Sequence, residues 1–442
     1  MPSKGELKAK VCEEIDRRSD EIIGVAKTVL KNAEPGFREV KTSRLVAQKF
    51  SEMGISYRDG IGITGVKGMV AGEENGLTVG VLGELDSLIV SDHPAADKET
   101  GAAHACGHHA QIGMLIGVAA ALTGSGVLPS LGGNVALIAV PAEEYIEIEF
   151  RNNLRKQRKL SYLGGKAELI KLGEFDDIDI AMMTHTTSVP TMRKLSAGGT
   201  NNGMVAKQIR FIGRGAHAGG TPHQGINALN AAMIALSAIH AQRETFQDKD
   251  TVRVHPIITK GGEAVNIVPA DVRMETFVRG KTMEAIIDAN QKVDRALRAG
   301  ALAVGGKVHI TTLPGYMPIR NNPDLIELYR ENALSLVGEE GIGQSSHRTG
   351  STDMGDVSNI MPVVHPYAGG AVGTSHGSDY LIEDYHLAVI NPAKAMAMLV
   401  VDLLADGAAK GKDILVRHKA NMTKQEYLDF MDSQVKEEEY DS

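Results

Sequence analysis

Apolar residues recur at helical spacing in two segments near the start of the chain, residues 6–31 and 41–53. Gly54 is placed to end the second helix, because glycine readily adopts the backbone conformation that closes helices. Beyond it the pattern changes to short, nearly continuous apolar runs. Three such runs predict buried strands, at residues 77–85, 134–140 and 179–184. A longer apolar stretch over residues 109–122 predicts a helix between the first two of these strands.

Each of the three predicted strands ends at polar residues, namely Asp86, the pair Glu143 and Glu144, and His185. Strands that alternate with helices favour a mixed, mostly parallel sheet with helices on both faces. In open sheets of this kind the binding crevice forms at the carboxyl ends of the strands. Core packing alone does not predict polar residues at all three ends. The pattern therefore predicts an α/β domain with a binding site along one sheet edge.

A different pattern begins near the glycines at 198 and 199 and continues to about residue 312. The order of its elements is βαββαβ, the two-layer sandwich of ferredoxin-like type. The predicted strands are 203–212, 251–260, 270–279 and 307–313, and the predicted helices are 225–243 and 282–303. Further helices at 323–337 and 391–405 return to the first domain. We therefore expect residues 1–197 and 313–442 to form one domain, into which residues 198–312 are inserted.

Composition narrows the class of protein. At 442 residues the chain is long enough for two domains with real cores. Its net charge is -8 with both signs dispersed, which argues against nucleic acid as a partner. The one basic run, residues 151–159, is interpreted as a solvated helix face, and the acidic tail at 436–442 as a frayed end.

Cysteine usage and hydropathy predict a cytoplasmic protein with no membrane segment. Cys12 and Cys106 are the two cysteines, too few for a disulfide framework, and a reducing compartment fits them. The N-terminal segment is polar and lacks the apolar core of a secretory signal. The longest apolar run, residues 112–122, is too short to span a bilayer.

The densest chemistry lies in residues 104–109, His-Ala-Cys-Gly-His-His, which hold one thiol and three imidazoles. Thiolate, imidazole and carboxylate groups are the usual ligands of divalent transition metals. The pair Glu143 and Glu144 could add one ligand and one general base that takes a proton from metal-activated water. Buried structural side chains at 104–109 and an exposed acidic loop at 143–144 are the alternatives.

Several segments together carry a resemblance to a known family. They are HACGHH at 104–109, PAEE at 141–144, GRGAHAGGTPHQGINAL at 213–229, GGEAVNIVPADVRMETFVRG at 261–280 and GSTDMGDVS at 350–358, together with His185. The chain resembles the aminoacylase/carboxypeptidase family of co-catalytic metallopeptidases. Within that family it is most similar to the N-acyl-amino-acid amidohydrolase branch, which includes indole-3-acetyl-amino-acid hydrolases and aminobenzoyl-glutamate hydrolase. The resemblance covers most of the chain, in family order.

The resemblance implies a zinc-peptidase-like catalytic domain that holds two divalent transition-metal ions, Mn²⁺ or Zn²⁺. It assigns Cys106 as a thiolate bridging the two ions, with Glu143 as the general base. The remaining metal ligands that it implies are His108, Glu144, His185 and His376. One sulfur, several imidazoles and few carboxylates make a softer site than Mg²⁺ or Ca²⁺ prefers.

The resemblance also implies roles outside the ligand set. Asp86 matches an aspartate that hydrogen-bonds a ligand histidine, although a strand-end cap is an alternative. His217 matches a histidine of the inserted domain that reaches the partner subunit's site and polarises the scissile carbonyl. Asn266 and Arg279 match substrate-site positions, with a surface location as the alternative for Arg279. We therefore expect a homodimer formed through residues 198–312.

Three departures from the family pattern leave the substrate open. His109 stands where the family usually has Asp, and could change the surroundings of the metal or add a ligand. Tyr145 and a charged insertion to about Lys159 replace a usual Gly. The loop from Asp86 to Gly101 is longer than expected.

The interpretation favoured by these residues is a metal-dependent amidohydrolase acting on a small N-acyl or N-aroyl amino acid or a dipeptide-like molecule. Hydrolytic deamination of an aryl amine on the same site is one alternative, and a non-catalytic metal- or ligand-binding protein is another. Two further motifs fit poorly. Residues 373–377, Gly-Thr-Ser-His-Gly, match a serine-hydrolase elbow but follow a glycine-rich loop instead of a strand. Residues 213–219 look like a phosphate cradle but contain His where Lys-Ser/Thr is needed.

Overall fold

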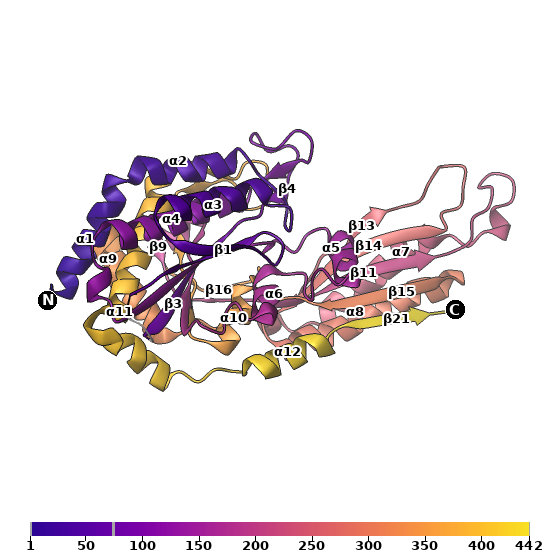
Figure 1. Cartoon of the computed structure of the whole chain (residues 1–442). Helices are drawn as coiled ribbons and strands as arrows, with labels where there is room; N and C mark the ends of the chain where they lie inside the picture. The colour runs from indigo at the N-terminus through magenta and orange to yellow at the C-terminus, as the bar shows by residue number, and fades with distance from the viewer. Residues whose placement is uncertain (1, 73–75, 442) are drawn as a thin grey trace.

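The computed structural model describes residues 2–72 and 76–441, and it shows an elongated molecule with a larger and a smaller part (Figure 1). Within these residues, six strands of the larger part form one sheet in the order β1-β2-β6-β3-β7-β17. β2 pairs antiparallel with β1 and with β6, whereas β6, β3, β7 and β17 run parallel. The bounds are β1 Ser56–Ile61, β2 Gly65–Val70, β3 Leu77–Glu84, β6 Gly133–Val140, β7 Ile180–Met182 and β17 Val363–Val364.

Helices cover both faces of this sheet, which confirms the predicted α/β class. One face packs against α1 Lys4–Arg17, α2 Ser19–Leu30, α3 Val40–Glu52, α4 His108–Gly124, α9 Pro323–Val337 and α11 Asn391–Arg417. The other face packs against α6 Gly165–Leu172, α10 Met354–Ile360 and α12 Lys424–Ser433. Side chains alternate between the faces along each strand, so that Val81 lies in the first core and Leu82 in the second. The continuous apolar runs of the sequence reflect this burial on both sides.

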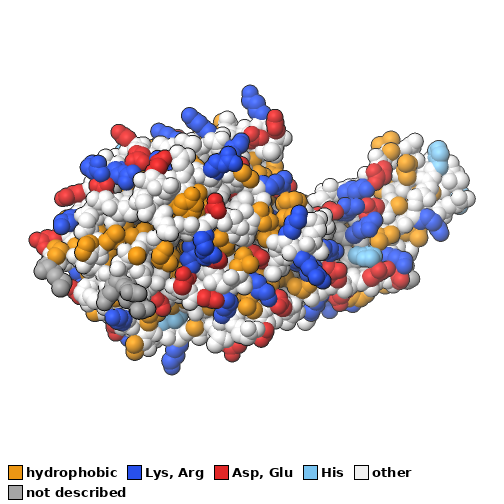
Figure 2. Space-filling view, viewed as in Figure 1, with side chains coloured by type: hydrophobic (Ala, Val, Ile, Leu, Met, Phe, Trp, Pro, Cys, Tyr) orange, Lys and Arg blue, Asp and Glu red, His pale blue; other side chains and the backbone are white. Residues whose placement is uncertain are grey.

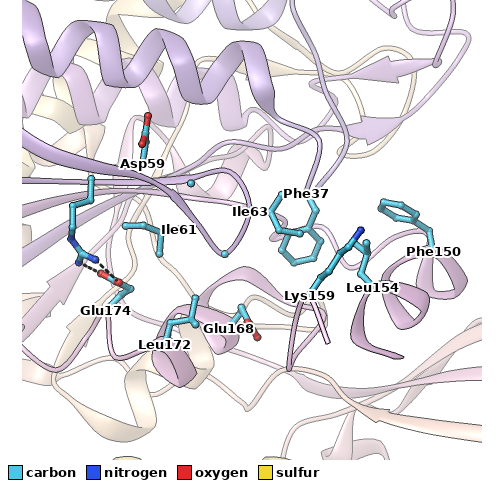
Figure 3. Close-up of a pocket in the computed structure, with 13 residues that line it drawn as sticks. Phe37, Asp59, Ile61, Ile63, Phe150, Leu154, Lys159, Glu168, Leu172 and Glu174 are labelled. Atoms are coloured by element: carbon cyan, nitrogen blue, oxygen red, sulfur yellow. Dashed lines mark hydrogen bonds and ion pairs between the residues drawn. The ribbon is translucent and has the colours of Figure 1, made fainter. Parts of the chain in front are cut away.

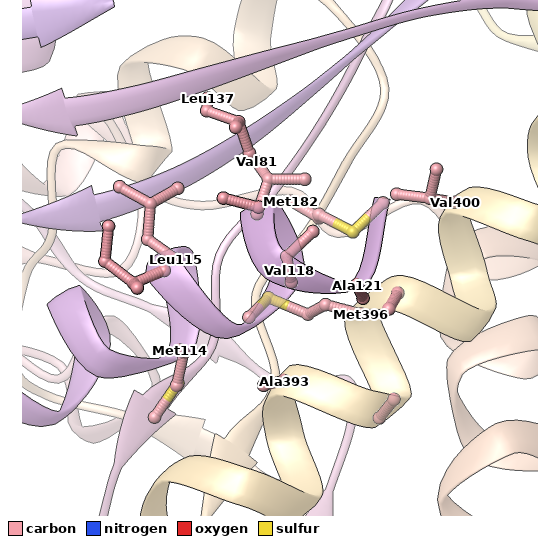
Figure 4. Close-up of a cluster of buried hydrophobic side chains, with 14 of the residues drawn as sticks. Val81, Met114, Leu115, Val118, Ala121, Leu137, Met182, Ala393, Met396 and Val400 are labelled. Carbon is pink, nitrogen blue, oxygen red and sulfur yellow. The ribbon is translucent and has the colours of Figure 1, made fainter. Parts of the chain in front are cut away.

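The first core explains why α4 has no polar face. Figure 4 shows side chains of the sheet, α4 and α11 meeting in one cluster. Its labelled members are Val81, Leu137 and Met182 from the sheet, Met114, Leu115, Val118 and Ala121 from α4, and Ala393, Met396 and Val400 from α11. Burying one large apolar side chain contributes about 1.5–3 kcal/mol, so this layer fixes α4 firmly against the strands. The residues just before and at the start of α4 are therefore held in place.

The smaller part is a second sheet with two helices on one face. Its strands follow the order β12-β14-β11-β15-β21, and β13 also pairs with β14. The elements are β11 Gly203–Ile212, α7 Ala228–Gln242, β12 Arg253–Val254, β13 Ile257–Lys260, β14 Asp271–Gly280, α8 Met283–Val304 and β15 Lys307–Pro314. This order confirms the inserted βαββαβ sandwich, with the strand predicted at 251–260 split in two. The part projects from the larger one and is visibly narrower (Figure 2).

Short elements outside the two main sheets complete the fold. They are β4 Leu88–Ile89, β5 Ala102–Ala103, α5 Ile148–Lys156, β8 His185–Thr186, β9 Leu195–Ser196, β10 Thr200–Asn201, β16 His347–Arg348, β18 Tyr367–Ala368, β19 Ala371–Val372 and β20 Leu381–Ile382. β10 pairs with β16, and β18 pairs with β8 and β9. These pairings place residues 185–201 next to residues 347–368.

The expectation of a frayed acidic tail was wrong. Residues Lys436–Tyr440 form β21, which pairs antiparallel with β15 from Thr312↔Lys436 to Val308↔Tyr440. The end of the chain thus lies on the sheet of the smaller part. Acidic side chains are compatible with this position because β21 is an edge strand, where charge discourages pairing with other chains. Ser442 lies outside the described residues.

The interpretation of residues 151–159 as a solvated helix face was wrong for Arg151. The residue lies on α5 and its side chain is 0% exposed. Its guanidinium donates to the backbone oxygens of Leu163 (2.9 Å), Ala142 (3.1 Å) and Glu144. Arg151 therefore holds the loop that carries the acidic pair, and only the remaining basic side chains of the run face outward.

One described helix is long and apolar enough to cross a membrane by length and composition, which the sequence analysis did not expect. It runs over His386–Arg417, joining the turn η7 His386–Ile390 to α11. Of its most apolar window, 83% is buried inside the protein. Non-helical backbone from Ala405 to Ala408 also interrupts it. Core packing against α4 and α9 accounts for its composition.

Candidate metal centre and active site

Two groups of potential metal ligands share one sulfur atom. Cys106, His108 and His185 form the first group, and Cys106, Glu144 and His376 form the second. Within each group one donor atom per residue lies within 4.8 Å of the others. A thiolate at Cys106 could therefore contact two ions at once. Glu144 and His185 follow β6 and β7, as the strand-end pattern predicted, whereas Cys106 and His108 lie just before and at the start of α4 and His376 lies in a late loop.

The turn before α4 places Cys106 and His108 on either side of Gly107. Gly107 is the N-cap of α4 and has φ 88°, a conformation that favours glycine. A side chain at this position would also collide with the hydroxyl of Thr186. The tight turn brings the Cys106 sulfur to 3.4 Å from Nε2 of His185. Glycine is thus required between the two candidate ligands.

Hydrogen bonds orient the two buried imidazoles with one nitrogen toward the sulfur. Nδ1 of His108 donates to the backbone oxygen of Asp86 at 2.9 Å, with the Asp86 carboxylate at 3.2 Å. Nδ1 of His185 donates to the backbone oxygen of Thr186 at 2.7 Å. In each case Nε2 then carries the lone pair that a metal needs. Burial lowers the pKa of His185 to about 4, which keeps its ring neutral.

The acidic pair follows β6 in a loop whose backbone is tied from several sides. The Glu144 amide donates to the Asp86 carboxylate at 2.8 Å, and Tyr316 donates its hydroxyl to the Glu143 backbone oxygen. The Glu144 carboxylate lies 3.4 Å from Nε2 of His376. His376 itself has φ 66° and donates its amide to Ala105 at 2.9 Å. Asp86 thus contacts the segments of both ligand groups.

The donor set fits divalent metal ions. Burial and the Glu144 carboxylate raise the pKa of the Cys106 thiol well above its usual range, so its thiolate needs a cation in contact. In the described part of the chain, Nε2 of His108 and Oε1 of Glu144 are buried without a hydrogen-bond partner. Leaving such atoms unpaired is costly, and metal coordination would satisfy both.

Glu143 belongs to neither group that shares Cys106, although it forms a third group of potential ligands with Glu84 and His108. Its carboxylate is 3.9 Å from Nε2 of His108 and lines the same hollow as Cys106 and Glu144. Burial and the carboxylates of Glu84 and Glu144 raise its pKa well above the usual range. A carboxyl group with a raised pKa next to a metal site is suited to accept and return a proton.

A buried ion cluster beneath this site was not found from the sequence. Lys166 contacts the carboxylates of Glu84, at 2.6 Å, and Asp353, and the three side chains are 0% exposed. Although burial opposes it, the carboxylates of Asp353 and Glu84 raise the pKa of Lys166. The other Glu84 oxygen lies 3.1 Å from Nε2 of His108 and accepts from Gln111 at 2.7 Å. In the sequence, the one sign of this cluster was Glu84, a charged residue within the apolar run 77–85.

Replacing Lys166 with Met is expected to destabilise the protein by about 3–5 kcal/mol, because two buried carboxylates lose their cation. Urea unfolding of the metal-free protein measures the effect. Lys171→Met, on the same helix, is the matched control. Its exposed ion pair with Asp432, at 3.6 Å, is worth about 0–1 kcal/mol. Equal losses in the two variants would contradict a structural role for the buried cluster.

The hollow in front of the candidate ligands has a volume of about 700 Å³. Both parts of the molecule line it, and the predicted substrate residue Arg279 is among its lining residues. Tyr145 also lines it, with its hydroxyl donated to the backbone oxygen of Pro314 at 2.7 Å. Tyr145, the first residue of the insertion after Glu144, therefore forms part of the wall.

His217 and Asn266 lie side by side on the smaller part but do not line this hollow within the described chain. The Ala218 amide donates to the Asn266 backbone oxygen at 3.0 Å, and the His217 side chain is exposed. Nδ1 of His217 accepts from the amides of Gly219 (3.1 Å) and Gly220 (3.0 Å). Nε2 must therefore carry the proton of the neutral ring and face outward as a donor.

His109, the first departure from the family pattern, is buried beside the centre without joining either ligand group. Its Nε2 lies 3.3 Å from the hydroxyl of Tyr385, and its ring packs 5.3 Å from that of His104. Burial lowers the pKa of His109 to about 3. Ser375 follows the two-residue strand β19, but turns and β20 come after it instead of the helix of a nucleophile elbow, so the serine-hydrolase alternative is not supported.

A larger hollow of about 940 Å³ lies elsewhere on the surface (Figure 3). Ile61, Ile63, Phe37, Leu154 and Leu172 give it an apolar lining. The ion pair between Arg58 and Glu174 lies at one end, drawn with dashed lines. Among the described residues, none of the candidate ligands that share Cys106 contributes to it. The candidate active site is therefore the smaller hollow, which the candidate ligands line.

Comparisons with known proteins show which proteins this chain is similar to. Residues 200–304 match the Peptidase dimerisation domain. A human Xaa-Arg dipeptidase is 30% identical over 327 residues, which cover 70% of this chain and 68% of the human protein. An IAA-amino acid hydrolase of Arabidopsis thaliana is 23% identical over 352 residues, 78% of this chain and 76% of that protein.

A similar fold occurs among solved structures. A dinuclear metal-binding peptidase of the M20 family from Bacillus subtilis superimposes with a TM-score of 0.61 at 20% identity. The match covers 87% of this chain and 98% of that one. It shows that the two parts described here together make up one known architecture.

Proposed function

Because the chain belongs to the M20 family of metal-dependent hydrolases, which act on C–N bonds, we propose that it cleaves the amide bond of a small N-acyl or N-aroyl amino acid or a dipeptide-like molecule. The observation that carries this proposal is the pair of ligand groups sharing Cys106, with the Glu143 carboxylate beside them. A protein that only binds a metal has no use for such a carboxylate. The hollow of about 700 Å³ is of the size that small substrates need.

We assign Cys106 as the residue whose thiolate two Mn²⁺ or Zn²⁺ ions would share. His108 and His185 would hold one of these ions, and Glu144 and His376 would hold the other. Bound there, the ions would acidify a water molecule and polarise the carbonyl group of the substrate. Asp86 keeps Nδ1 of His108 protonated, so that Nε2 remains a ligand atom.

Proton transfer falls to Glu143. Its carboxylate takes a proton from the attacking water and returns it to the departing amine nitrogen, which cannot leave as an anion. One residue can serve as both base and acid because the proton that it accepts in the first step is the proton that it donates in the second. Tyr316 and Arg151 fix the backbone on either side of this carboxylate, so it is held ready for transfer.

We further propose that His217 acts in the partner subunit's site as the donor to the carbonyl oxygen, with Asn266 beside it. Support comes from the outward-facing Nε2–H, and from the fact that neither residue is among the described residues that line the hollow of their own chain. The two edges of the smaller sheet differ. β21 carries Glu437, Glu438 and Glu439, whereas β13 carries the exposed side chains of Ile257 and Ile258. The homodimer is therefore expected to form along the β13 edge.

Complementation tests the shared site. His217→Ala and Glu143→Gln are each expected to be inactive, yet mixing and re-associating the two should restore activity. Some mixed dimers then combine an intact Glu143 with an intact His217 from the other chain. Each parent should bind metal normally, which serves as the control. Mixed dimers that form but remain inactive would place His217 outside the partner's site.

Aryl-amine deamination, the alternative that rested on His109 and Tyr145, gains no support from their positions. The His109 ring faces Tyr385 and His104, and the Tyr145 hydroxyl faces a backbone oxygen. We therefore expect the metal-loaded protein to release free amino acids from an N-acyl amino acid panel and nothing from aryl amines. Mass detection of the products decides between them. A cytoplasmic location stays a prediction, to which two free cysteines are suited.

A further inference from the structure

The wall of the active-site hollow carries more positive charge than one carboxylate needs. Arg253, Arg279 and Arg348 all line it. Among residues 2–72 and 76–441, none of the three has a carboxylate oxygen within 4.0 Å. Arg253 donates to the backbone oxygen of Val252 at 3.0 Å. Guanidinium groups that face a substrate cavity without a protein carboxylate are suited to anions of the substrate.

Arg253 and Arg279 form a pair that is unfavourable without a ligand. They are directly opposite each other on β12 and β14, where like charges repel. Arg279 is half-buried, and its guanidinium lies 4.9 Å from the ring centre of Phe277. Stacking fixes the plane of the group while leaving its N–H donors free. A carboxylate held by this pair would remove the repulsion.

Arg348 lies on β16 and comes from the larger part of the molecule. Its guanidinium lies 4.5 Å from the ring centre of Tyr367. The same group donates a hydrogen bond to the sulfur of Met192, a weak acceptor, at 3.3 Å. The neighbouring His347 contacts the Thr251 hydroxyl at 3.0 Å, which ties β16 to the segment leading into β12. The cationic side chains of the two parts are therefore brought to the same cavity.

His365, which packs against the same Tyr367 ring as Arg348, supplies an independent sign of a polar ligand. It lines the cavity and is 1% exposed, and within the described chain both of its ring nitrogens lack a hydrogen-bond partner. Its ring lies 5.1 Å from that of Tyr367 and 6.1 Å from that of His185. A buried imidazole left unpaired is costly, by about 1–3 kcal/mol. An acceptor atom of the substrate between His365 and Arg348 would satisfy it.

We infer that the amine-side portion of the substrate is a dicarboxylate, an acidic amino acid such as a glutamyl or aspartyl residue. The Arg253–Arg279 pair holds the α-carboxylate, and Arg348 with His365 holds the side-chain carboxylate. This inference rests on the proposed amide hydrolysis and adds the substrate class. A cationic side chain is excluded from the same place by repulsion from Arg348.

Kinetics with three matched substrates test this inference. The metal-loaded enzyme should hydrolyse N-acetyl-L-glutamate with a kcat/KM about 10²-fold above that for N-acetyl-L-glutamine, and higher still relative to N-acetyl-L-lysine. Arg348→Met keeps the packing on Tyr367 and should reduce the glutamate-to-glutamine ratio to a few-fold. Arg253→Met, at an exposed position, should lower kcat/KM for all three substrates alike. This variant replaces Arg348→Met in the test if Arg348→Met does not fold. Arg44→Met, on the exposed side of α3, is the control and should leave the ratio unchanged.

A ratio near one, or a preference for the lysine substrate, would overturn the inference while leaving amide hydrolysis intact. If none of the three is hydrolysed, the proposed function has failed, and calorimetry on the metal-loaded protein then decides the inference. Glutarate should bind at least about tenfold more tightly than butyrate, which lacks the second carboxylate, and Arg348→Met should abolish that difference. Equal affinities for glutarate and butyrate would overturn it.

Discussion

Replacing Glu143 with Gln is expected to lower kcat by about 10²–10⁴-fold while the metal content stays near normal. The amide keeps the shape of the side chain but cannot accept a proton. Because Glu143 belongs to neither ligand group that shares Cys106, the ions should remain bound. Steady-state kinetics and metal analysis on the same preparation measure the two effects.

Glu147→Gln is the matched control for this variant. Glu147 lies in the same loop but forms its ion pair with Arg38, away from the candidate ligands. The substitution should therefore leave kcat within a factor of about two, since exposed ion pairs contribute little. Near-normal turnover in Glu143→Gln would reject the assignment of the general base. Loss of metal in that variant would instead make Glu143 a ligand.

Replacing Cys106 with Ala is expected to deprive both metal positions of a ligand at once. Metal content should fall well below that of the wild type, and turnover should fall to the background level, because each ion loses its shared sulfur. Zn²⁺ or Mn²⁺ per chain, measured after dialysis against buffer without metal, gives the result.

Cys12→Ala controls for the general effect of removing a thiol. Cys12 lies on α1, and burial raises its pKa to about 11, so it is a neutral, partly buried side chain. This variant should keep its full metal content and activity. A Cys106→Ala protein that keeps both ions would contradict the bridging thiolate.

Part of the site could be predicted because local pattern and chain direction determine it. The apolar runs that became β3, β6 and β7 are buried on both faces and run parallel, so their polar ends had to meet at one edge. Asp86, Glu144 and His185 follow from that alone. His376 could not be predicted from the spacing of apolar residues, because it lies in a loop and has a positive φ. Only the family resemblance indicated it.

Other residues could not be predicted because their surroundings form only in the folded chain. Lys166 and Asp353 are far apart in sequence, and each is an ordinary charged residue until both meet Glu84 in the core. Arg151 was misinterpreted for the same reason, since its basic neighbours do face solvent while it turns inward. The arrangement of His365 beside Arg348 likewise depends on how β16 and β18 pack, and not on any local motif.

The C-terminal strand β21 shows a limit of predicting structure from the sequence pattern. The sequence Lys436-Glu-Glu-Glu-Tyr440 has too few apolar residues to indicate a strand. It forms β21 because β15 presents unpaired backbone groups along its edge, which any extended segment can satisfy. Tertiary hydrogen bonding therefore outweighed the local composition there.

Metal titration of the dialysed protein tests the central claim most directly. Metal-free protein is titrated with Mn²⁺ or Zn²⁺ while the hydrolysis of N-acyl amino acids and dipeptides is followed. We predict no turnover without metal and a rise that reaches its plateau at two equivalents per chain. Full activity without metal, a plateau at one equivalent, or no amide hydrolysis at two equivalents would contradict a binuclear amidohydrolase centred on Cys106.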